Sequence, residues 1–282
     1  MNYPYNTANT TIKGAGKISY IDEGAGKQTI LFIHGLANYA LVWSKNIDYL
    51  RAHYRCIAID LPGNGLSDGG DLPYSISFFA DAISEFIRTL QLENVVLAGH
   101  SMGGQIALTT LLNHPDLTEQ VVLCSPAGFE TFSAFEIGLY KNSMNFFDLF
   151  TSEENSLKQI IQHSFYHRSN HAEKIANDLV QLMRLQPIKE YRKMVDACIH
   201  GMLHEPVFDK LHSIKQKALI LFGENDELIP NKLLHHTTTK KIAEQGASRF
   251  TSAELHMISQ CGHFVQWEKA DKTNQLIHAF LK

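Results

Sequence analysis

The chain has 282 residues and a formal net charge of −4, since 25 Lys and Arg oppose 29 Asp and Glu. With 44% hydrophobic and 19% charged residues, its composition is that of an ordinary globular protein, which excludes a wholly disordered or collagen-like chain. The chain has no block of basic residues that would predict nucleic-acid binding. Its apolar runs all fall short of the roughly 18 residues that a membrane span requires. The N-terminus lacks the basic and apolar regions of a signal peptide, so we expect a cytoplasmic protein.

The first third of the sequence predicts alternating strands and helices. Short runs that are apolar or that alternate predict strands at 17–22, 29–33, 56–61, 94–98 and 120–124. Apolar residues at helical spacing predict helices at 41–51, 77–90 and 102–113. The glycine tracts at 14–17 and 24–27 are each expected to form a hairpin turn. Neither is a phosphate-binding loop, because no Ser or Thr follows the Gly-Lys pair.

Residues 129–213 show helical patterns and no convincing strand, after which the alternation resumes. Strands are expected at 217–222 and 254–259, and helices at 232–245 and 269–281. Strands alternating with helices predict a mostly parallel sheet. We therefore expect a core of residues 1–128 and 214–282, with residues 129–213 inserted as a helical cap. Seven of the 16 phenylalanines lie between Phe129 and Phe165, and most are expected to pack the cap onto the core.

The sharpest motif is Gly99-His100-Ser101-Met102-Gly103-Gly104, which directly follows a predicted strand and opens a predicted helix. A nucleophile must project from a sharp strand-to-helix turn, and small residues two positions to either side let strand and helix approach. The helix N-terminus then offers backbone N–H groups to a developing oxyanion. One alternative interpretation of this motif is a dinucleotide-binding fingerprint, which fails because it needs glycine where Ser101 stands. The other alternative is a chance match to the pattern. The context favours Ser101 as a nucleophile.

A serine nucleophile needs a base, and the base needs an orienting acid. The expected order along the chain is serine, acid and then histidine, each on a loop after a strand. Strand 217–222 is followed by Gly223-Glu224-Asn225-Asp226-Glu227, in which we assign the acid to Asp226 and keep Glu224 and Glu227 as surface alternatives. The last predicted strand is followed by Cys261-Gly262-His263-Phe264, which makes His263 the expected base.

The loop after strand 29–33 reads His34-Gly35-Leu36-Ala37 and predicts the second donor to an oxyanion. We assign that donor to the backbone N–H of Leu36 and pair it with the N–H of Met102. His34 is expected to hold the loop structurally.

Two further sets of residues are expected to be structural. The four cysteines stand far apart without a CxxC pair, so they are expected to be buried and not to form a disulfide framework. His163, His167 and His171 are spaced four apart, but no carboxylate motif such as HExxH accompanies them. We therefore expect a solvated helix face there and no metal site.

Together these segments resemble the α/β-hydrolase family over nearly the whole chain. The matching segments are His34-Gly35, residues 60–67 (Asp-Leu-Pro-Gly-Asn-Gly-Leu-Ser), 99–104 and 223–226, and Gly262-His263. The resemblance implies an α/β-hydrolase fold with a mostly parallel eight-stranded sheet, flanking helices, a helical cap inserted after the sixth strand, and no cofactor. A serine at position 101 argues against the epoxide-hydrolase and haloalkane-dehalogenase branches, whose nucleophile is a carboxylate.

The C-terminal segment 261–268 resembles the carbon–carbon-bond hydrolases that act on ring-cleavage products. The chain departs from that subfamily at Leu36-Ala37-Asn38, where further Gly and Pro usually follow His-Gly. Such an enzyme would want a cation for an enolate or carboxylate, and the insertion offers Arg168, Arg184 and Arg192.

We therefore predict a serine hydrolase that cleaves carboxylic esters of small-to-medium apolar substrates through an acyl-enzyme. The alternative activity is hydrolysis of a carbon–carbon bond in a vinylogous diketone. A non-catalytic ligand-binding protein on the same fold is the alternative of another class, and a complete triad argues against it. The expected partner is a small apolar ester or ketone, with no nucleic acid and no metal.

Overall fold

The fold is built on one eight-stranded sheet with the strand order β1-β2-β4-β3-β5-β6-β7-β8. A computed structural model describes residues 3–142, 154–166, 170–184 and 187–282. The strands are β1 (Thr7–Ile12), β2 (Gly16–Glu23), β3 (Thr29–Ile33), β4 (Arg55–Ile59), β5 (Val95–His100), β6 (Thr118–Cys124), β7 (Lys217–Gly223) and β8 (Ala253–Ile258). All neighbours from β4 to β8 in this order pair in parallel, whereas β1–β2 and β2–β4 are antiparallel. The expected eight-stranded, mostly parallel sheet is confirmed.

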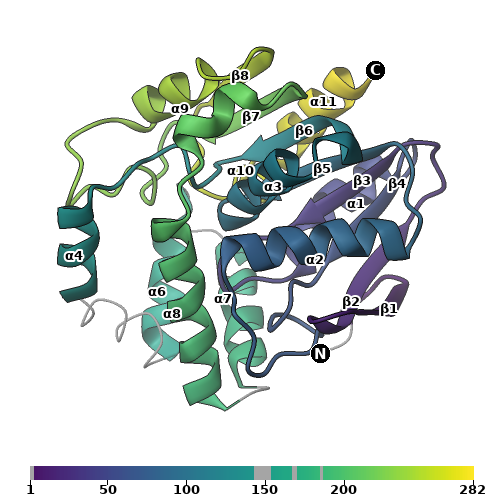
Figure 1. Cartoon of the computed structure of the whole chain (residues 1–282), viewed down its shortest axis with the longest axis horizontal. Helices are drawn as coiled ribbons and strands as arrows, with labels where there is room; N and C mark the ends of the chain where they lie inside the picture. Colours follow the sequence, from purple (N-terminus) through teal and green to yellow (C-terminus); the bar gives the residue numbers. More distant parts are fainter. Residues whose placement is uncertain (1–2, 143–153, 167–169, 185–186) are drawn as a thin grey trace.

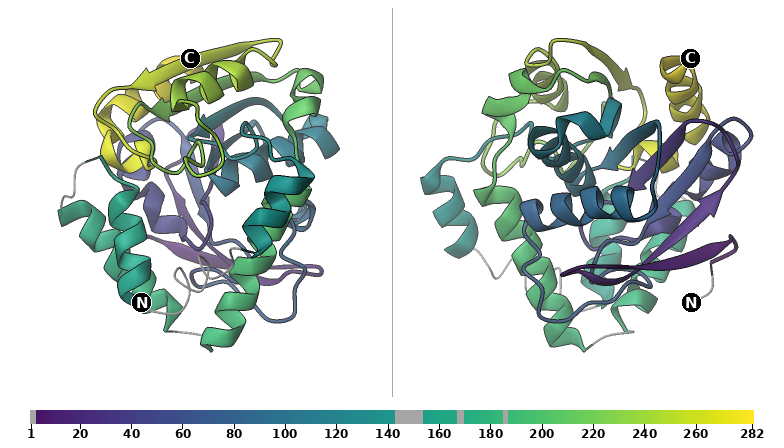
Figure 2. Two further views of the ribbon diagram at one scale, coloured as in Figure 1. Left: turned by 90° about the vertical axis from the view of Figure 1, so that its left-hand side faces the viewer. Right: turned by 45° about the vertical axis from the view of Figure 1, so that its right-hand side comes forward.

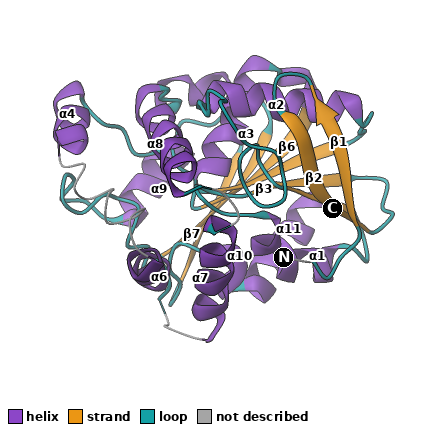
Figure 3. Cartoon of the chain, turned by 90° about the horizontal axis from the view of Figure 1, so that it is seen from below, coloured by secondary structure: helices purple, strands orange, loops and turns teal. Residues whose placement is uncertain are grey.

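Helices cover both faces of the sheet. Their bounds are η1 (Ala40–Trp43), α1 (Ser44–Leu50), α2 (Ile76–Thr89), α3 (Met102–Asn113), η2 (Pro115–Leu117), α9 (Thr239–Ala247), α10 (Val265–Glu268) and α11 (Ala270–Leu281). On one face α2 packs against α3, and on the other α1 packs against α10 and α11 (Figure 3). β3 and β5 are buried at every residue, because helices lie above and below them. This burial explains their continuously apolar sequences.

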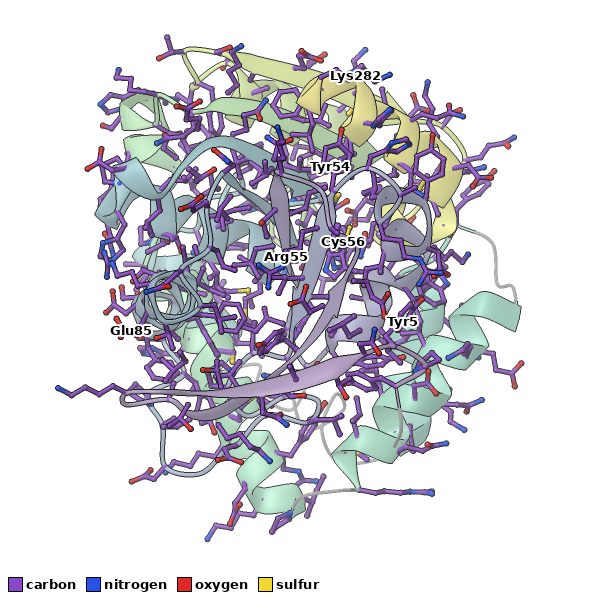
Figure 4. The ribbon with its side chains drawn as sticks, turned by 90° about the vertical axis from the view of Figure 1, so that its right-hand side faces the viewer. Tyr5, Tyr54, Arg55, Cys56, Glu85 and Lys282 are labelled. Atoms are coloured by element: carbon purple, nitrogen blue, oxygen red, sulfur yellow. The ribbon has the colours of Figure 1, made fainter. Side chains whose placement is uncertain are left out.

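The antiparallel edge of the sheet differs in part from the sequence prediction. The turn at Gly14 joins β1 to β2 as a hairpin, as expected. The second expected hairpin, at 24–27, is wrong, because β2 pairs with β4 and not with β3. Across that β2–β4 pair, the Arg55 guanidinium binds both carboxylate oxygens of Asp22, at 3.0 and 2.7 Å. Figure 4 shows Arg55 at the start of β4, on the right-hand side of Figure 1.

Between β6 and β7 the chain forms a group of helices. They are α4 (Ala134–Asn142), α6 (Glu154–His163), α7 (Asn170–Met183), α8 (Ile188–His204) and η3 (Phe208–Ser213). α6 packs on α7, and α8 contacts α2 of the core (Figure 1). Figure 1 shows α6, α7 and α8 together at the lower end of the view and α4 at its left-hand edge, and Figure 2 shows the same arrangement from two further sides.

The phenylalanines of this insertion have different environments. Phe129 is buried against Phe222 and Phe250 of the core, with ring centroids 6.0 Å apart in both pairs. Phe165 is buried, but Phe135 on α4 is 74% exposed. Phe146, Phe147 and Phe150 lie outside the described residues.

The helix expected at 232–245 begins later than its sequence suggests. Asn231 Oδ1 accepts the N–H groups of Leu233 and Leu234, which forms a turn in place of the first helical residues. Helix α9 then starts at Thr239, where the Thr238 hydroxyl accepts the N–H of Lys241 as an N-cap. Apolar spacing alone does not reveal this competition between side chain and backbone.

The state of the cysteines and the length of the apolar helices can be read from the structure. All four cysteines are buried and free of disulfide bonds, as expected. Across the described ranges, no helix is both long enough and apolar enough to cross a membrane.

Candidate active site

The predicted site residues follow strands whose carboxyl ends meet at one edge of the sheet. Gly35 follows β3, Ser101 follows β5, Asp226 follows β7 and His263 follows β8. These strands are parallel neighbours or are linked by parallel β6. Ligand and catalytic sites of parallel sheets lie outside the carboxyl ends of the strands.

Ser101 occupies a sharp turn between β5 and α3. Its backbone has φ 54° and ψ −120°, a left-handed conformation that non-glycine residues rarely adopt. The turn is held from the neighbouring strand, because Ser101 N–H donates to Cys124 O at 3.0 Å and Ala127 N–H donates to Ser101 O at 2.9 Å. Local backbone strain of this kind occurs at functional sites.

Gly103 explains why the turn needs a small residue. A Cβ at this position would lie 2.3 Å from Ile33 O and 2.5 Å from His34 O, both of which are backbone atoms. The first turn of α3 therefore rests directly on the chain that leaves β3. This contact brings residues 34–37, which are predicted to bind an oxyanion and are called the oxyanion loop below, beside Ser101. A Cβ at Gly35 would lie only 3.0 Å from Ser101 Cβ.

Asp226 and His263 form a buried pair. His263 Nδ1 lies 2.8 Å from Asp226 Oδ2, and the two side chains are 4% and 0% exposed. The other oxygen, Asp226 Oδ1, accepts the N–H groups of Leu228 at 2.8 Å and Ile229 at 3.1 Å. Because an ionised carboxylate only accepts hydrogen bonds, we assign the proton to Nδ1. The Nε2 atom of His263 then keeps a free lone pair and can act as a base.

The structure thus brings the expected acid and base together and sets Ser101 beside the oxyanion loop. Within the part of the chain that the structure describes, the Ser101 hydroxyl makes no hydrogen bond with His263. Such contacts often tighten only when substrate binds. Glu224 and Glu227, the alternative acids, are both exposed.

His34 holds the oxyanion loop through two hydrogen bonds. Its Nδ1–H donates to Gly35 O at 2.8 Å, and its Nε2 accepts Leu61 N–H at 3.0 Å. Burial lowers the pKa of His34 to about 4, so the ring stays neutral and keeps both bonds at neutral pH. For the residues described, neither Leu36 nor Met102 donates its N–H to a hydrogen bond. Both groups therefore keep their capacity to bind an oxyanion.

Asp60, which follows β4, binds three separate parts of the chain through its carboxylate. Its carboxylate accepts Tyr3 Oη–H at 2.8 Å, Ala40 N–H at 2.7 Å and Leu66 N–H at 2.9 Å. Complete burial raises the pKa of Asp60 to about 6, although the three donors oppose that rise. Residues 60–67 carry part of the resemblance to the family, but no motif in them predicts this role for Asp60.

His100, the last residue of β5, joins this strand to the loop that carries His263. Its Nε2–H donates to His263 O at 3.1 Å, and the two imidazole rings lie 4.9 Å apart. Burial, together with nearby His263, lowers the pKa of His100 well below its usual range. A neutral His100 adds no positive charge beside the base.

A hydrogen bond joins helix α7 of the insertion to Tyr39, just after the oxyanion loop. The Tyr39 hydroxyl, fully buried after the oxyanion loop, donates to Asp178 Oδ2 of α7 at 2.7 Å. Lys174 Nζ contacts the same carboxylate oxygen at 2.7 Å. Periodicity could not reveal this contact, because its partners are 139 positions apart.

A cavity of about 410 Å³ lies between Ala37 and Asn38, residues 63–70 and helices α7 and α8, and neither Ser101 nor His263 is among its described lining residues. Its described lining carries the carboxylates of Asp68 and Glu190 but neither Lys nor Arg. Arg184 and Arg192 are therefore not among the described lining residues, and Arg168 lies outside the described residues. Apolar lining comes from Leu179 and Leu182 of α7.

Comparison with known proteins agrees with this architecture. The model of the alpha/beta hydrolase fold family matches residues 28–270. A 2-hydroxy-6-oxononadienedioate/2-hydroxy-6-oxononatrienedioate hydrolase from Paraburkholderia phymatum is 28% identical, over 94% of this chain and 91% of its own. A 2-hydroxy-6-oxo-6-phenylhexa-2,4-dienoate hydrolase from Comamonas testosteroni is 30% identical over the same shares, 94% and 91%.

A solved esterase from Exiguobacterium antarcticum has the same fold. It superposes with a TM-score of 0.82 at 24% identity, covering 97% of this chain and 99% of the esterase. The chain belongs to the α/β-hydrolase family. Family and relatives together make it a hydrolase.

Proposed function

We propose that this chain is a serine hydrolase that cleaves carboxylic esters of small-to-medium apolar substrates. Ser101 is the nucleophile, His263 the general base and Asp226 the acid that orients the base. The observation that carries the proposal is the buried 2.8 Å contact between His263 Nδ1 and Asp226 Oδ2. It leaves Nε2 as the proton acceptor at the same sheet edge as the strained Ser101.

In the acylation step, Ser101 Oγ bonds to the ester carbonyl carbon while its proton passes to His263 Nε2. The carbonyl electron pair moves to oxygen, and the backbone N–H groups of Leu36 and Met102 bind that oxyanion. When the pair returns, the bond to the alcohol oxygen breaks, and His263 gives its proton to the departing alkoxide.

Water completes the turnover. It adds to the acyl carbon as His263 takes one of its protons, and the second tetrahedral intermediate expels Ser101 Oγ. The serine oxygen recovers that proton from His263, so the carboxylic acid leaves and the enzyme returns to its starting state. Asp226 stays ionised throughout and stabilises the imidazolium that forms twice in each cycle.

The chemistry of the insertion supports an apolar substrate. Its helix α7 contributes Leu179 and Leu182 to the cavity beside Ala37 and Asn38, and sites for small molecules are lined mostly by apolar side chains. We further propose that residues 129–213 act as a cap over the site, with Leu179 and Leu182 supplying apolar contact. Each buried methylene is worth about 0.8 kcal/mol, or roughly fourfold in binding. We expect kcat/KM to rise from acetyl to butyryl esters.

A second candidate is hydrolysis of a carbon–carbon bond in a ring-cleavage product. It is favoured by the names of the two curated relatives, which match nearly the whole chain. The C-terminal segment 261–268 also resembles that group. It stands second because the chain departs from that group at Leu36-Ala37-Asn38, where further Gly and Pro usually follow His-Gly.

The experiment is a competition on the purified chain between p-nitrophenyl butyrate and a ring-cleavage dienoate. Ester hydrolysis is expected to have the higher kcat/KM. If dienoate cleavage exceeds it by about a hundredfold, which is ~2.7 kcal/mol of transition-state binding, the second candidate replaces the first.

A fluorophosphonate probe separates a hydrolase from a binding protein on the same fold. We expect rapid covalent labelling of the wild-type chain and none of Ser101→Ala. A wild-type chain that takes no label and cleaves neither substrate would support the binding protein.

A further inference from the structure

The carboxylate of Glu268 bridges the loop of His263 to the insertion. It ends helix α10, and its Oε1 accepts the N–H of Gly262 at 2.7 Å. Its Oε2 accepts the N–H of Tyr166, which lies 102 positions earlier in the chain, at 2.8 Å. One side chain therefore satisfies a backbone donor on each side of the junction.

The two backbones also meet directly. His263 N–H donates to Ser164 O at 2.8 Å. The backbone of His263 is therefore bound directly to the segment that follows α6. The rings of Phe165 and Phe264 stack with an interplanar angle of 5° and centroids 4.9 Å apart. Residues 164–166 and 262–264 thus run side by side, joined by backbone, carboxylate and aromatic contacts.

Gly262 makes this approach possible. A Cβ there would lie 2.5 Å from Ser164 O and 2.8 Å from Tyr166 N, which are both backbone atoms. No rotation of a side chain could relieve such a contact. The glycine before the histidine therefore serves the junction with the insertion and not only the turn.

These contacts act on the backbone of Gly262 and His263 and on the Phe264 ring, and none of them is made to the imidazole, whose Nδ1 is held by Asp226. The imidazole is thus located by two supports, one from the core and one from the insertion. A shift of about 1 Å in a catalytic group can cost on the order of a hundredfold in rate. The contacts of Glu268, Ser164 and Phe165 with residues 262–264 are placed to prevent such a shift.

We propose that Glu268 is a positioning residue for His263, and that it works by clamping the segment 164–166 against the loop 262–264. This inference rests on the proposed function, because it assigns the clamp to the general base of that reaction. It adds that the insertion sets the position of the base as well as covering the site.

The first test is Glu268→Gln, with Glu244→Gln, at an exposed position of helix α9, as the matched control. The amide has one oxygen, so its NH₂ group must face one of the two N–H donors. Rates are measured per active site, counted by fluorophosphonate titration, so that a merely unfolded fraction does not count. We expect kcat to fall about 10- to 100-fold while KM changes little, and Glu244→Gln to match the wild type.

The second readout does not depend on turnover. Proton NMR follows the downfield Nδ1–H resonance of His263, which the contact with Asp226 shields from exchange. In Glu268→Gln this resonance is expected to broaden or disappear at neutral pH, whereas in Ser101→Ala it persists. If both kcat per active site and the resonance of Glu268→Gln match the wild type, the positioning role is wrong.

Phe165→Leu tests the part played by the insertion. Loss of the stacked ring should lower kcat per active site in the same direction as Glu268→Gln, by a smaller factor. A change in KM alone would show that this segment only binds substrate, and would overturn the clamp. If the wild-type chain has a persistent resonance but neither labels nor turns over substrate, the proposed function fails and the clamp does not.

Discussion

The two carboxylate oxygens of Asp226 have separate partners. Oδ1 accepts two backbone N–H groups, from Leu228 and Ile229, which fixes the side chain in its turn. Oδ2 is left to face His263 Nδ1. In Asp226→Asn the amide NH₂ would face a ring N–H or force the other tautomer. We expect the fold to persist and kcat to fall by up to about 10⁴, measured with p-nitrophenyl butyrate.

The matched controls are Glu224→Gln and Glu227→Gln, which change carboxylates of the same loop. Both side chains are exposed, and Glu227 pairs with Lys232 at the surface. Each variant should keep wild-type kcat. A large loss in either of them, alongside a mild Asp226→Asn, would mean that the acid has been misassigned.

At the residue scale, motif and chain order predict Asp226 and His263 as acid and base, and the structure places these two side chains 2.8 Å apart. A serine elbow after one strand restricts the acid and the base to loops after later strands. The role of Glu268 was beyond that reasoning. Its partner Tyr166 belongs to the insertion, and only the folded chain brings the two together.

At the scale of whole elements, the contact between α3 and the chain leaving β3 sets the site. Gly103→Ala would press a methyl group onto Ile33 O and His34 O, so either the turn or the oxyanion loop must move. We expect a loss of about 1–3 kcal/mol in the free energy of unfolding, measured with urea, and a lower kcat.

Gly138→Ala is its control, because a Cβ on Gly138 meets nothing within 4 Å. Alanine is the better helix former by up to about 1 kcal/mol, so this variant should not lose stability. If the two variants unfold at the same urea concentration, close packing does not explain Gly103.

The elements that the sequence predicted best are those with a strong local signal. Helix α3 was expected at 102–113 and observed as Met102–Asn113, since a glycine elbow precedes it and His114-Pro115 ends it. Strand β1 was not expected, because this edge strand buries only Ile12 fully and shows no apolar alternation. The strand order depends on pairing between distant segments, which is why the turn at 24–27 was mistaken for a hairpin.

At the scale of the whole molecule, buried titratable groups near the oxyanion loop oppose one another. Burial lowers the pKa of His34 to about 4 and raises that of Asp60 to about 6. Below pH 6.5 the unfolded chain binds the proton that folded His34 refuses, so the free energy of unfolding falls as pH falls. Between about pH 6 and 4, folded Asp60 binds a proton that the unfolded chain does not, so this group adds stability as pH falls.

The two contributions are of similar size, about 3 kcal/mol each, and largely offset over that window. His100 acts in the same direction as His34, because burial also lowers its pKa well below its usual range. A folded chain that excludes this proton must lose stability in acid. The net expectation is a free energy of unfolding that decreases from pH 6.5 to pH 4.

Substitution of one group at a time separates these contributions. Urea unfolding between pH 4.5 and 7.5 should give a shallower loss in acid for His34→Gln, which removes a group that charges only on unfolding. Asp60→Asn should give a steeper loss, because it removes the group that offsets the histidines, even though its stability at pH 7.5 also changes. His212→Gln at an exposed position should follow the wild-type curve. An acid loss that is shallower in Asp60→Asn than in the wild type would reverse the sign assigned to this carboxylate.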